Sequence, residues 1–346
     1  MSDYSISQIY AQDTRANRQI DRLLEQEGIR RDPNLDYTCG MYDDEMNIIA
    51  TGSCFGNTLR CMAVDHNHQG EGLMNEIVTH LIEKQYERGN IHLFLYTKCS
   101  SARFFSSLGF FEIARIPDQV VFMENKRNGF DQWLSSLERR EGQKTGAIVM
   151  NANPFTLGHQ YLAEYAAGQC DVLHLFMVSE DKSIFPYNIR KKLIKEGTAH
   201  LDNIIYHDSG PYIISSATFP SYFQKDEASV ISSHAMLDLI IFTRIADQLG
   251  IQKRFVGEEP TSQVTGIYNS IMSSLLPEHG IECEIVPRKK DGDMVISAST
   301  VRQAIHDGDQ EILKRCLPAS TLEWLNSEEA VPVVSRIKNE TDLIHY

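Results

Sequence analysis

The stretch Gly146-Ala-Ile-Val-Met-Asn-Ala-Asn-Pro-Phe-Thr156-Leu-Gly158-His159 decides the fold that we expect for the second half of the chain. Its apolar run, residues 147–150, is typical of a parallel strand that is covered on both faces. Asn153-Pro154 ends that strand, and the apolar periodicity of residues 161–166 predicts a helix, which we expect to begin at His159. A helix N-terminus that faces the carboxyl end of a strand favours phosphate binding.

Three residues of this stretch carry the chemistry. Gly158 would let the backbone approach a nucleotide, while Thr156 and His159 would supply hydrogen-bond donors to the charge that develops at phosphorus. The alternative is a structural Gly-His at a helix start, because so short a motif occurs often by chance.

A second element, Ile296-Ser-Ala-Ser299-Thr-Val-Arg302, follows about 140 residues later. We expect Ser299 to cap a helix there and Arg302 to reach a phosphate. Thr156-x-Gly158-His159 together with this Ile-Ser-x-Ser-x-x-Arg element resembles the signature pair of the nucleotidylyltransferase superfamily. The resemblance implies a Rossmann-like parallel sheet.

Further buried strands are predicted at residues 172–178, 253–256 and 282–286. Lys182 and Arg190 follow the first of these, at the end of an α/β sheet where ligands bind, and are candidate phosphate contacts. The alternative is a solvated lysine and a surface arginine. Gly257 and Glu258 end the next strand and could border the ribose or base of a nucleotide.

The first half has another organisation. Residues 47–56 and 58–64 predict paired strands, and a glycine-bearing turn, Gln69-Gly70-Glu71-Gly72, leads into a helix over residues 75–85. Residues 91–96 predict a further strand, and a helix starts near Ser101. Amides at the glycine turn could cradle a pyrophosphate, although the turn could also merely join a strand to a helix.

This order, with Gln69-x-x-Gly72 and Phe105-x-x-Leu108-Gly109-Phe110, resembles a GNAT-type N-acetyltransferase domain over about residues 1–125. The resemblance implies that Gln69, Gly70 and Gly72 hold a coenzyme-A-like arm. Met74 stands where such loops usually end in Gly or Ala, so we expect arm binding rather than acetyl transfer to an amine.

Composition narrows the classes of function. The chain has 346 residues, 42% of them hydrophobic, which is enough for two domains with separate cores. A formal net charge of −14 argues against general nucleic-acid binding. The basic clusters at residues 190–192 and 288–290 could hold an anion locally, but such runs are more often solvated.

Other features concern the compartment. The first residues lack a secretory signal pattern, and no apolar run approaches the length of a membrane span, which predicts a cytoplasmic protein. The cysteines at positions 39, 54, 61, 99, 170, 283 and 316 form no Cys-x-x-Cys pair, so we expect reduced, mostly core thiols and no protein-bound metal.

The whole chain therefore predicts an α/β protein with a GNAT-like mixed-sheet domain (1–125), a helical connector with polar ends (126–144) and a nucleotidylyltransferase-like domain (145–346). This combination resembles the citrate lyase ligase family. The resemblance implies that ATP and acetate are used to acetylate the thiol of a phosphoribosyl-dephospho-coenzyme-A group on the acyl carrier subunit of citrate lyase, with AMP and pyrophosphate as products and Mg²⁺ as the companion of ATP.

The resemblance also implies roles for residues. Thr156, His159 and Lys182 would be catalytic. The contacts to ATP would come from both halves of the signature pair and from the strand end at 257, namely Asn153, Phe155, Gly158, Gly257, Glu258, Ser297, Ser299 and Arg302. Two rival functions remain open: an adenylyltransferase that makes a dinucleotide-type product, and an amine acetyltransferase with a nucleotide-sensing domain.

Overall fold

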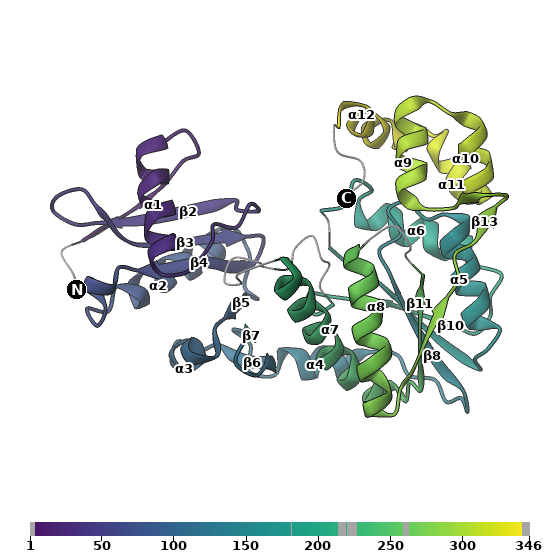
Figure 1. The fold of residues 1–346 in the computed structure, drawn as a ribbon, viewed down its shortest axis with the longest axis horizontal. Helices are drawn as coiled ribbons and strands as arrows, with labels where there is room; N and C mark the ends of the chain where they lie inside the picture. The colour runs from purple at the N-terminus through teal and green to yellow at the C-terminus, as the bar shows by residue number, and fades with distance from the viewer. Residues whose placement is uncertain (1–3, 181, 214–218, 220–226, 259–262, 341–346) are drawn as a thin grey trace. The chain divides into compact units, whose positions relative to one another are not determined.

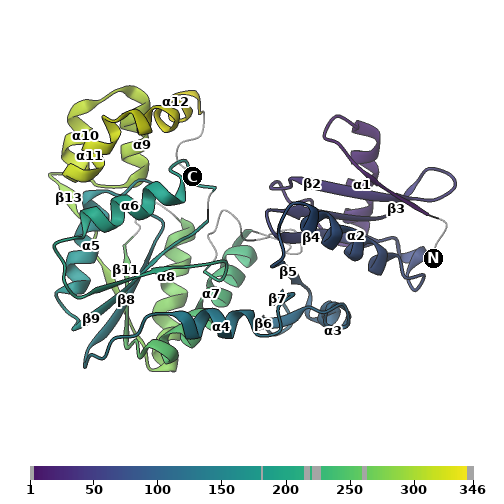
Figure 2. The same cartoon turned by 180° about the vertical axis from the view of Figure 1, so that it is seen from behind.

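The computed structural model describes residues 4–180, 182–213, 219, 227–258 and 263–340. These residues form two compact units, one made of residues 1–132 and 219–237 and the other of residues 133–218 and 238–346. Figure 1 and Figure 2 show the elements of each unit from opposite sides. The predicted bounds of the domains stay a prediction. The structure adds that Phe219 and residues 227–237 group with the first unit.

The first unit is built on a mixed sheet of seven strands in the order β1-β2-β3-β4-β5-β7-β6. Its strands are β1 (Ser5–Gln8), β2 (Tyr37–Tyr42), β3 (Ile48–Phe55), β4 (Thr58–Val64), β5 (Phe94–Thr97), β6 (Phe111–Ile116) and β7 (Val120–Glu124). All neighbouring pairs are antiparallel except β4 and β5. The sheet confirms the predicted mixed fold, although β5 starts three residues later than expected.

Helices cover both faces of this sheet. The helical segments are α1 (Thr14–Gln26), η1 (His66–His68), α2 (Leu73–Glu87), η2 (Cys99–Ser101), α3 (Ala102–Ser107) and α4 (Gly129–Ser136), which runs into the second unit. Alternate residues of β4 point to opposite faces, so Met62 packs with the core around α2 and Ala63 with the core around α1.

The parallel strands β4 and β5 separate soon after they meet. They pair at Thr58↔Phe94 and Leu59↔Leu95 alone. Cys61, with a φ of +49°, lies in a bulge of β4 where three residue steps oppose two on β3. Because a bulge bends its strand and increases the local twist, it favours this separation of the strand ends.

The second unit contains a five-stranded sheet in the order β10-β9-β8-β11-β12, all parallel, as predicted. Its strands are β8 (Thr145–Met150), β9 (Val172–Met177), β10 (Ile204–Asp208), β11 (Lys253–Gly257) and β12 (Glu282–Val286). The chain moves outward from β8 on one side and then returns to β11 on the other. The crevice outside the carboxyl ends of β8 and β11 is therefore the switch point where such sheets bind ligands.

Helices flank this sheet. They are α5 (Leu157–Ala167), α6 (Tyr187–Gly197), α8 (Gln263–Leu275), η3 (Leu276–His279) and the part of α7 (Glu227–Leu249) from Asp238 onward, since its earlier residues belong to the first unit. Right-handed crossovers that run in opposite directions from the centre place α5 and α8 on opposite faces, as both views show. A small hairpin follows, β13 (Lys290–Asp291) with β14 (Met294–Val295), and then α9 (Ala298–Asp307), α10 (Gln310–Cys316), α11 (Ala319–Leu325), η4 (Glu328–Ala330) and α12 (Val331–Asn339).

Helix α7 corrects one expectation from the sequence. Its residues Ser229–Leu249 are long and apolar enough to cross a membrane by length and composition, contrary to the prediction that no segment approaches a span. About half of the window, 56%, is buried inside the protein, and a core helix passes the same test of length and composition. The cysteines behave as predicted: all seven are free thiols, and Cys39, Cys54, Cys61 and Cys316 are buried.

Candidate functional sites

Asn153 lies in the loop that follows β8 and connects this loop to the segment around Phe185. Asn153 is buried with 3% of its surface exposed, and its Oδ1 accepts the backbone N–H of Phe185 at 2.9 Å. This contact fixes Nδ2 as the donor side of the amide. Nδ2 is buried and has no hydrogen-bond partner among the described residues.

Helix α5 begins at Leu157, not at His159 as expected, because Thr156 is its N-cap. The Oγ1 of Thr156 accepts the backbone N–H of His159 at 3.4 Å, and the N–H of Thr156 donates to Nδ1 of His159 at 3.1 Å. This is a capping box in which a histidine replaces the usual Glu or Gln. The helix starts two residues earlier because these reciprocal bonds satisfy its first donors.

The same bonds define the protonation of His159. Since the N–H of Thr156 must donate, Nδ1 carries the lone pair, and the proton of the neutral imidazole lies on Nε2. Burial, and then the positive charge of Arg288, lower the pKa of His159 to about 4. At neutral pH the residue is therefore an uncharged donor through Nε2.

Gly158 joins the two motifs. A Cβ at this position would lie 2.9 Å from the carbonyl oxygen of Ile296, which real Cβ atoms essentially never do. The absence of a side chain is therefore required by the approach of α5 to the second motif. This reason differs from the expected one, the approach of a nucleotide, which stays a proposal.

The second motif is capped two residues earlier than expected. The Oγ of Ser297 accepts the N–H of Thr300 at 3.0 Å, so Ser297, not Ser299, is the N-cap of α9. Ser297 has the extended backbone that a cap needs, with φ −135° and ψ 159°. Ser299 lies inside the first turn, with its Oγ 2.9 Å from the Oγ of Ser297.

Arg302 supports the loop after β8. Its side chain is buried, and its Nη1 donates to the carbonyl oxygen of Asn153 at 2.6 Å. The sequence predicted that Arg302 reaches a phosphate, whereas the observed contact is with the backbone of the first motif. Arg302 is thus a positioning residue, and a direct phosphate contact stays a proposal.

Two other residues that the sequence placed near the nucleotide, Phe155 and Arg190, have buried side chains. The ring of Phe155 is fully buried in the core, where it lies so close to Gly197 that a Cβ there would be 2.2 Å from it. Its side chain therefore has a core position, and a contact of Phe155 with ATP stays a proposal. Arg190 is fully buried too, and its guanidinium donates to the carbonyls of Phe185, Asn151 and Val178, so it is neither a surface arginine nor placed to bind phosphate.

The remaining predicted residues lie at the same edge of the sheet. Lys182 follows β9 with an exposed side chain. Gly257 ends β11, and Glu258 follows it with an exposed side chain. The carbonyl oxygen of Glu258 accepts Nε–H of Arg288 at 2.6 Å.

Arg288 is a residue that the sequence indicated only as part of a basic run. It is half-buried and lies close enough to lower the pKa of His159. Its position two residues after β12, at the carboxyl edge of the sheet, is the signal that could have identified it.

The described residues contain no group of three His, Cys, Asp or Glu side chains that could hold a metal ion. Mg²⁺ that accompanies nucleotides is commonly held by the phosphates and one or two carboxylates, so no such cage is needed for it.

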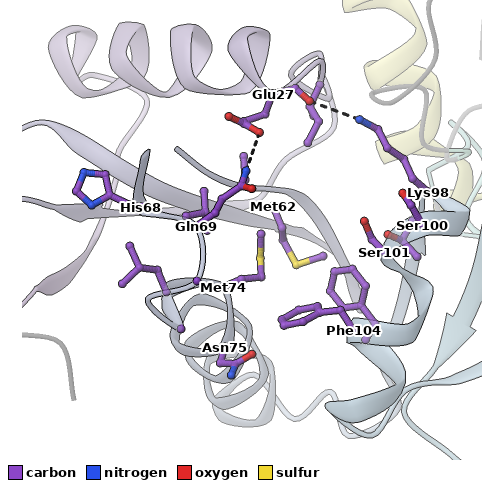
Figure 3. A pocket seen from close by; sticks show the side chains of 18 of the residues that line it. Glu27, Met62, His68, Gln69, Met74, Asn75, Lys98, Ser100, Ser101 and Phe104 are labelled. Carbon is purple, nitrogen blue, oxygen red and sulfur yellow. Dashed lines mark hydrogen bonds between the residues drawn. The ribbon is translucent and has the colours of Figure 1, made fainter. Parts of the chain in front are cut away.

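The first unit contains a cavity of about 600 Å³ where β4 and β5 diverge (Figure 3). Its apolar lining includes Met62, Tyr96 and Phe104, and its polar lining includes Ser100 and Ser101. This size lies within the range of small-molecule sites.

The glycine turn borders this cavity, and its binding of a coenzyme-A-like arm stays a proposal. Gln69, Gly70 and Gly72 all line it, and so does Met74. Gly70 and Gly72 have φ values of +92° and +85°, which other residues rarely adopt. Gly72 is also the N-cap of α2 and makes no side-chain cap hydrogen bond, although the N–H of Asn75 donates to the carbonyl oxygen of Gly72 at 3.0 Å. The amides before Asn75 at this helix start are the ones suited to an anion.

Comparison with known families matches both units. Residues 145–325 match the model of the citrate lyase ligase C-terminal domain, and residues 4–110 match the acetyltransferase (GNAT) family. Known relatives cover both of these matched regions. A [citrate [pro-3S]-lyase] ligase of Klebsiella pneumoniae is 41% identical over 316 residues, which cover 88% of this chain and 91% of the relative.

Two other bacterial proteins of the same name are similarly related. The one from Escherichia coli K12 is 39% identical and covers 89% of this chain and 90% of its own length, and the one from Haemophilus influenzae is 39% identical over 88% and 94%. Among solved structures, a putative acyl-CoA N-acyltransferase of Klebsiella pneumoniae covers 35% of this chain and 96% of its own, with 21% identity and a TM-score of 0.30. That last likeness is too slight to carry an argument.

Proposed function

Because this chain belongs to the citrate lyase ligase family, we propose that it activates citrate lyase by acetylating the thiol of a prosthetic group on the acyl carrier subunit of that enzyme. The acetyl group comes from acetate, ATP supplies the energy, and AMP and pyrophosphate are released. The prosthetic group is a phosphoribosyl-dephospho-coenzyme-A arm. The reaction is that of an AMP-forming acid–thiol ligase, and a cytoplasmic location follows from its substrates.

Acetate must be activated, because a carboxylate is a poor acyl donor. In the first step a carboxylate oxygen of acetate attacks the α-phosphorus of ATP, the bond between the α-phosphorus and the bridging oxygen breaks, and pyrophosphate leaves. In the second step the thiol sulfur attacks the acyl carbon, its proton passes to solvent, and the bond from acyl carbon to AMP oxygen breaks. Neither step needs a covalent intermediate on the protein.

His159 is the proposed donor to the α-phosphate. It is neutral at pH 7, and its Nε2 carries the proton because Nδ1 accepts from Thr156. A fixed donor aimed at developing charge stabilises a transition state without reorganisation. Thr156 orients the imidazole and, with the first amides of α5, contributes to the same anion site.

Other residues at this edge hold the rest of ATP in the proposal. Ser297 and Ser299 at the start of α9 and Lys182 after β9 contact the β- and γ-phosphates. Gly158 and Nδ2 of Asn153 border the α-phosphate, the latter as a buried donor that lacks a partner among the described residues. Gly257 and Glu258 border the ribose or base. Mg²⁺ enters with the triphosphate.

The observation that carries this proposal is the meeting of the two halves of the motif. Nη1 of Arg302 contacts Asn153, and Gly158 lies against Ile296, so residues about 140 positions apart form one site at the switch point of the sheet. A site of this kind suits attack on the α-phosphorus of a nucleotide.

The arm of the carrier is proposed to lie in the cavity of the first unit. Its diphosphate would bind the amides of residues 69–72 and Gln69, and its pantetheine chain would lie along Met62 and Phe104. Support comes from the open glycine turn and from the apolar interior beyond it.

The function is tested by incubating the protein with ATP, acetate and pyrophosphatase, with and without the acyl carrier, and measuring free AMP. The ligase releases AMP in proportion to acetylated carrier. AMP retained in a dinucleotide-type product would support the rival adenylyltransferase, and acetyl-coenzyme A turnover on an amine without ATP would support the rival acetyltransferase.

A further inference from the structure

Arg288 lies at the carboxyl edge of the second sheet, two residues beyond the end of β12. Its Nε–H donates to the carbonyl oxygen of Glu258 at 2.6 Å, and the N–H of Glu258 donates to the carbonyl oxygen of Val286 at 2.8 Å. These bonds continue the pairing of β11 with β12 past its last pair, Gly257 and Val286. Arg288 is therefore held beside the strand end that borders the ribose or base in the proposed function.

The residue after Arg288 connects it to the start of α5. The carbonyl oxygen of Lys289 accepts the N–H of Ile296 at 3.1 Å. The carbonyl oxygen of the same Ile296 lies 2.9 Å from the position that a Cβ would take at Gly158. The segment that carries Arg288 is thus bonded to the residue that packs against the first turn of α5, where His159 lies.

The charge of Arg288 acts on this helix start. The pKa of His159 is lowered to about 4, first by burial and then by the positive charge of Arg288. Burial also lowers the pKa of Arg288, while the nearby charge of Glu258 raises it, and an arginine keeps its charge in proteins. A partly desolvated cation beside the positive end of a helix gains stability from an anion that lies between them.

We propose that Arg288 binds the α-phosphate of the nucleotide and keeps this contact from ATP through the adenylate to AMP. The inference rests on the proposed function, in which His159 donates to the α-phosphate while Gly257 and Glu258 border the ribose or base. The α-phosphate is the phosphate that is joined to the ribose. A cation held between the contacts to the ribose and the start of α5 therefore suits this phosphate, and Arg288 is a further catalytic residue of the proposed reaction.

The chemistry of a guanidinium suits this role. Its N–H donors form a planar fork, which can bind a phosphate in a bidentate manner while Nε–H stays on the carbonyl oxygen of Glu258. When acetate attacks, negative charge grows on the α-phosphate oxygens, and a cation already in place stabilises it. The β- and γ-phosphates then leave as pyrophosphate, whereas the α-phosphate stays. Arg288 thus retains the adenylate until the carrier thiol reacts with it.

Calorimetric titration of the full-length protein tests this contact with three probes: adenosine, AMP, and ATP with Mg²⁺. Arg288→Gln should weaken AMP and ATP alike, by about ten- to a hundredfold, because both lose hydrogen bonds between charged groups. It should leave the affinity for adenosine, which has no phosphate, unchanged. Arg288→Lys should cause a smaller loss for the same two ligands, because an ammonium keeps the charge but not the fork.

Lys290→Gln is the matched control, because it removes one positive charge from an exposed position in the same basic run. It should leave all three affinities as in the wild type when salt screens exposed charges. Weakened ATP with unchanged AMP in Arg288→Gln would place the residue at the β- or γ-phosphate and overturn the proposal. An equal loss for adenosine, or no loss for any probe, would overturn it as well.

Failure of the proposed function would give a different result. A wild type that binds AMP, yet releases none from ATP in the presence of acetate and carrier, would contradict the ligase reaction. The AMP affinities of the variants would still decide whether Arg288 binds the α-phosphate. A wild type that binds none of the three probes would show that the nucleotide site itself is wrong, and the role of Arg288 would fall with it.

Discussion

Nη1 of Arg302 lies 2.6 Å from the carbonyl oxygen of Asn153, so a buried guanidinium in the second motif holds the loop of the first. This contact predicts the outcome of Arg302→Lys. An ammonium keeps the charge but not the planar set of donors. The free energy of unfolding should fall by about 1–3 kcal/mol, and the KM for ATP should rise more than the KM for acetate, because the displaced loop borders the phosphates.

Chemical denaturation and acetate-dependent pyrophosphate exchange measure these two effects of Arg302→Lys. Equal changes in both KM values would contradict the proposed position of the loop.

Gly158→Ala tests the approach of α5 to the second motif. Its Cβ would meet the backbone oxygen of Ile296, which cannot move aside as a flexible side chain can. We expect a loss of about 1–3 kcal/mol in the free energy of unfolding and a clear loss of pyrophosphate exchange. Gly266→Ala in α8 is the control, since nothing lies within 4 Å of its Cβ and alanine favours helices there. A Gly158→Ala protein as stable and active as Gly266→Ala would refute the contact.

His159 should act without titrating in the usual range of histidine. Its pKa is lowered to about 4, so the neutral form, with the proton on Nε2, persists as the pH falls from 8 to about 5. The rate of pyrophosphate exchange should therefore show no fall near pH 6.5 attributable to this residue. His159→Ala should lower exchange by about two to three orders of magnitude while the protein stays folded by circular dichroism. Near-normal exchange in this variant would remove the active-site assignment.

The buried pair His174 and His207 predicts how stability depends on pH. Their rings are stacked, and Nδ1 of His174 lies 2.8 Å from Nε2 of His207. Burial lowers the pKa of each to about 4, whereas an unfolded histidine titrates near 6.5. As the pH falls, the unfolded chain binds these protons before the folded chain does. The contribution of the pair to the free energy of unfolding is therefore complete above about pH 6.5 and is lost as the pH falls toward 4. Each histidine contributes a slope of up to about 1.4 kcal/mol per pH unit.

Denaturation at a series of pH values measures this slope. His207→Phe should reduce the slope by the contribution of one proton, about 1.4 kcal/mol per pH unit. A slope that is the same in His207→Phe as in the wild type would contradict the neutral buried pair.

The sequence predicted best those features that depend on local patterns. The strand predicted from the apolar run at residues 147–150 and the helix after it follow from short apolar periods and turn residues, and the structure contains both, as β8 (Thr145–Met150) and α5. The second motif likewise leads into a helix, α9. The predicted mixed sheet of the first unit and the predicted parallel sheet of the second unit are both confirmed.

Local sequence patterns could not predict features that depend on contacts between residues far apart in the chain. Whether Ser297 or Ser299 caps α9 depends on which residue has extended backbone, and either fits the sequence. That Arg190 and Arg302 bind buried carbonyls is decided by loops that meet only in the folded chain. The grouping of residues 227–237 with the first unit has no local signal, because it joins segments about 100 residues apart.

Isotope transfer from acetate to AMP tests the central claim, the formation of acetyl adenylate, most directly. In the proposed reaction an oxygen of acetate forms the bond to the α-phosphorus and stays with AMP when the carrier thiol takes the acetyl group. Acetate labelled with ¹⁸O in its carboxyl group should therefore yield AMP that contains one labelled oxygen per turnover, in amounts equal to the acetylated carrier, as mass spectrometry would show. Unlabelled AMP alongside acetylated carrier would contradict the account.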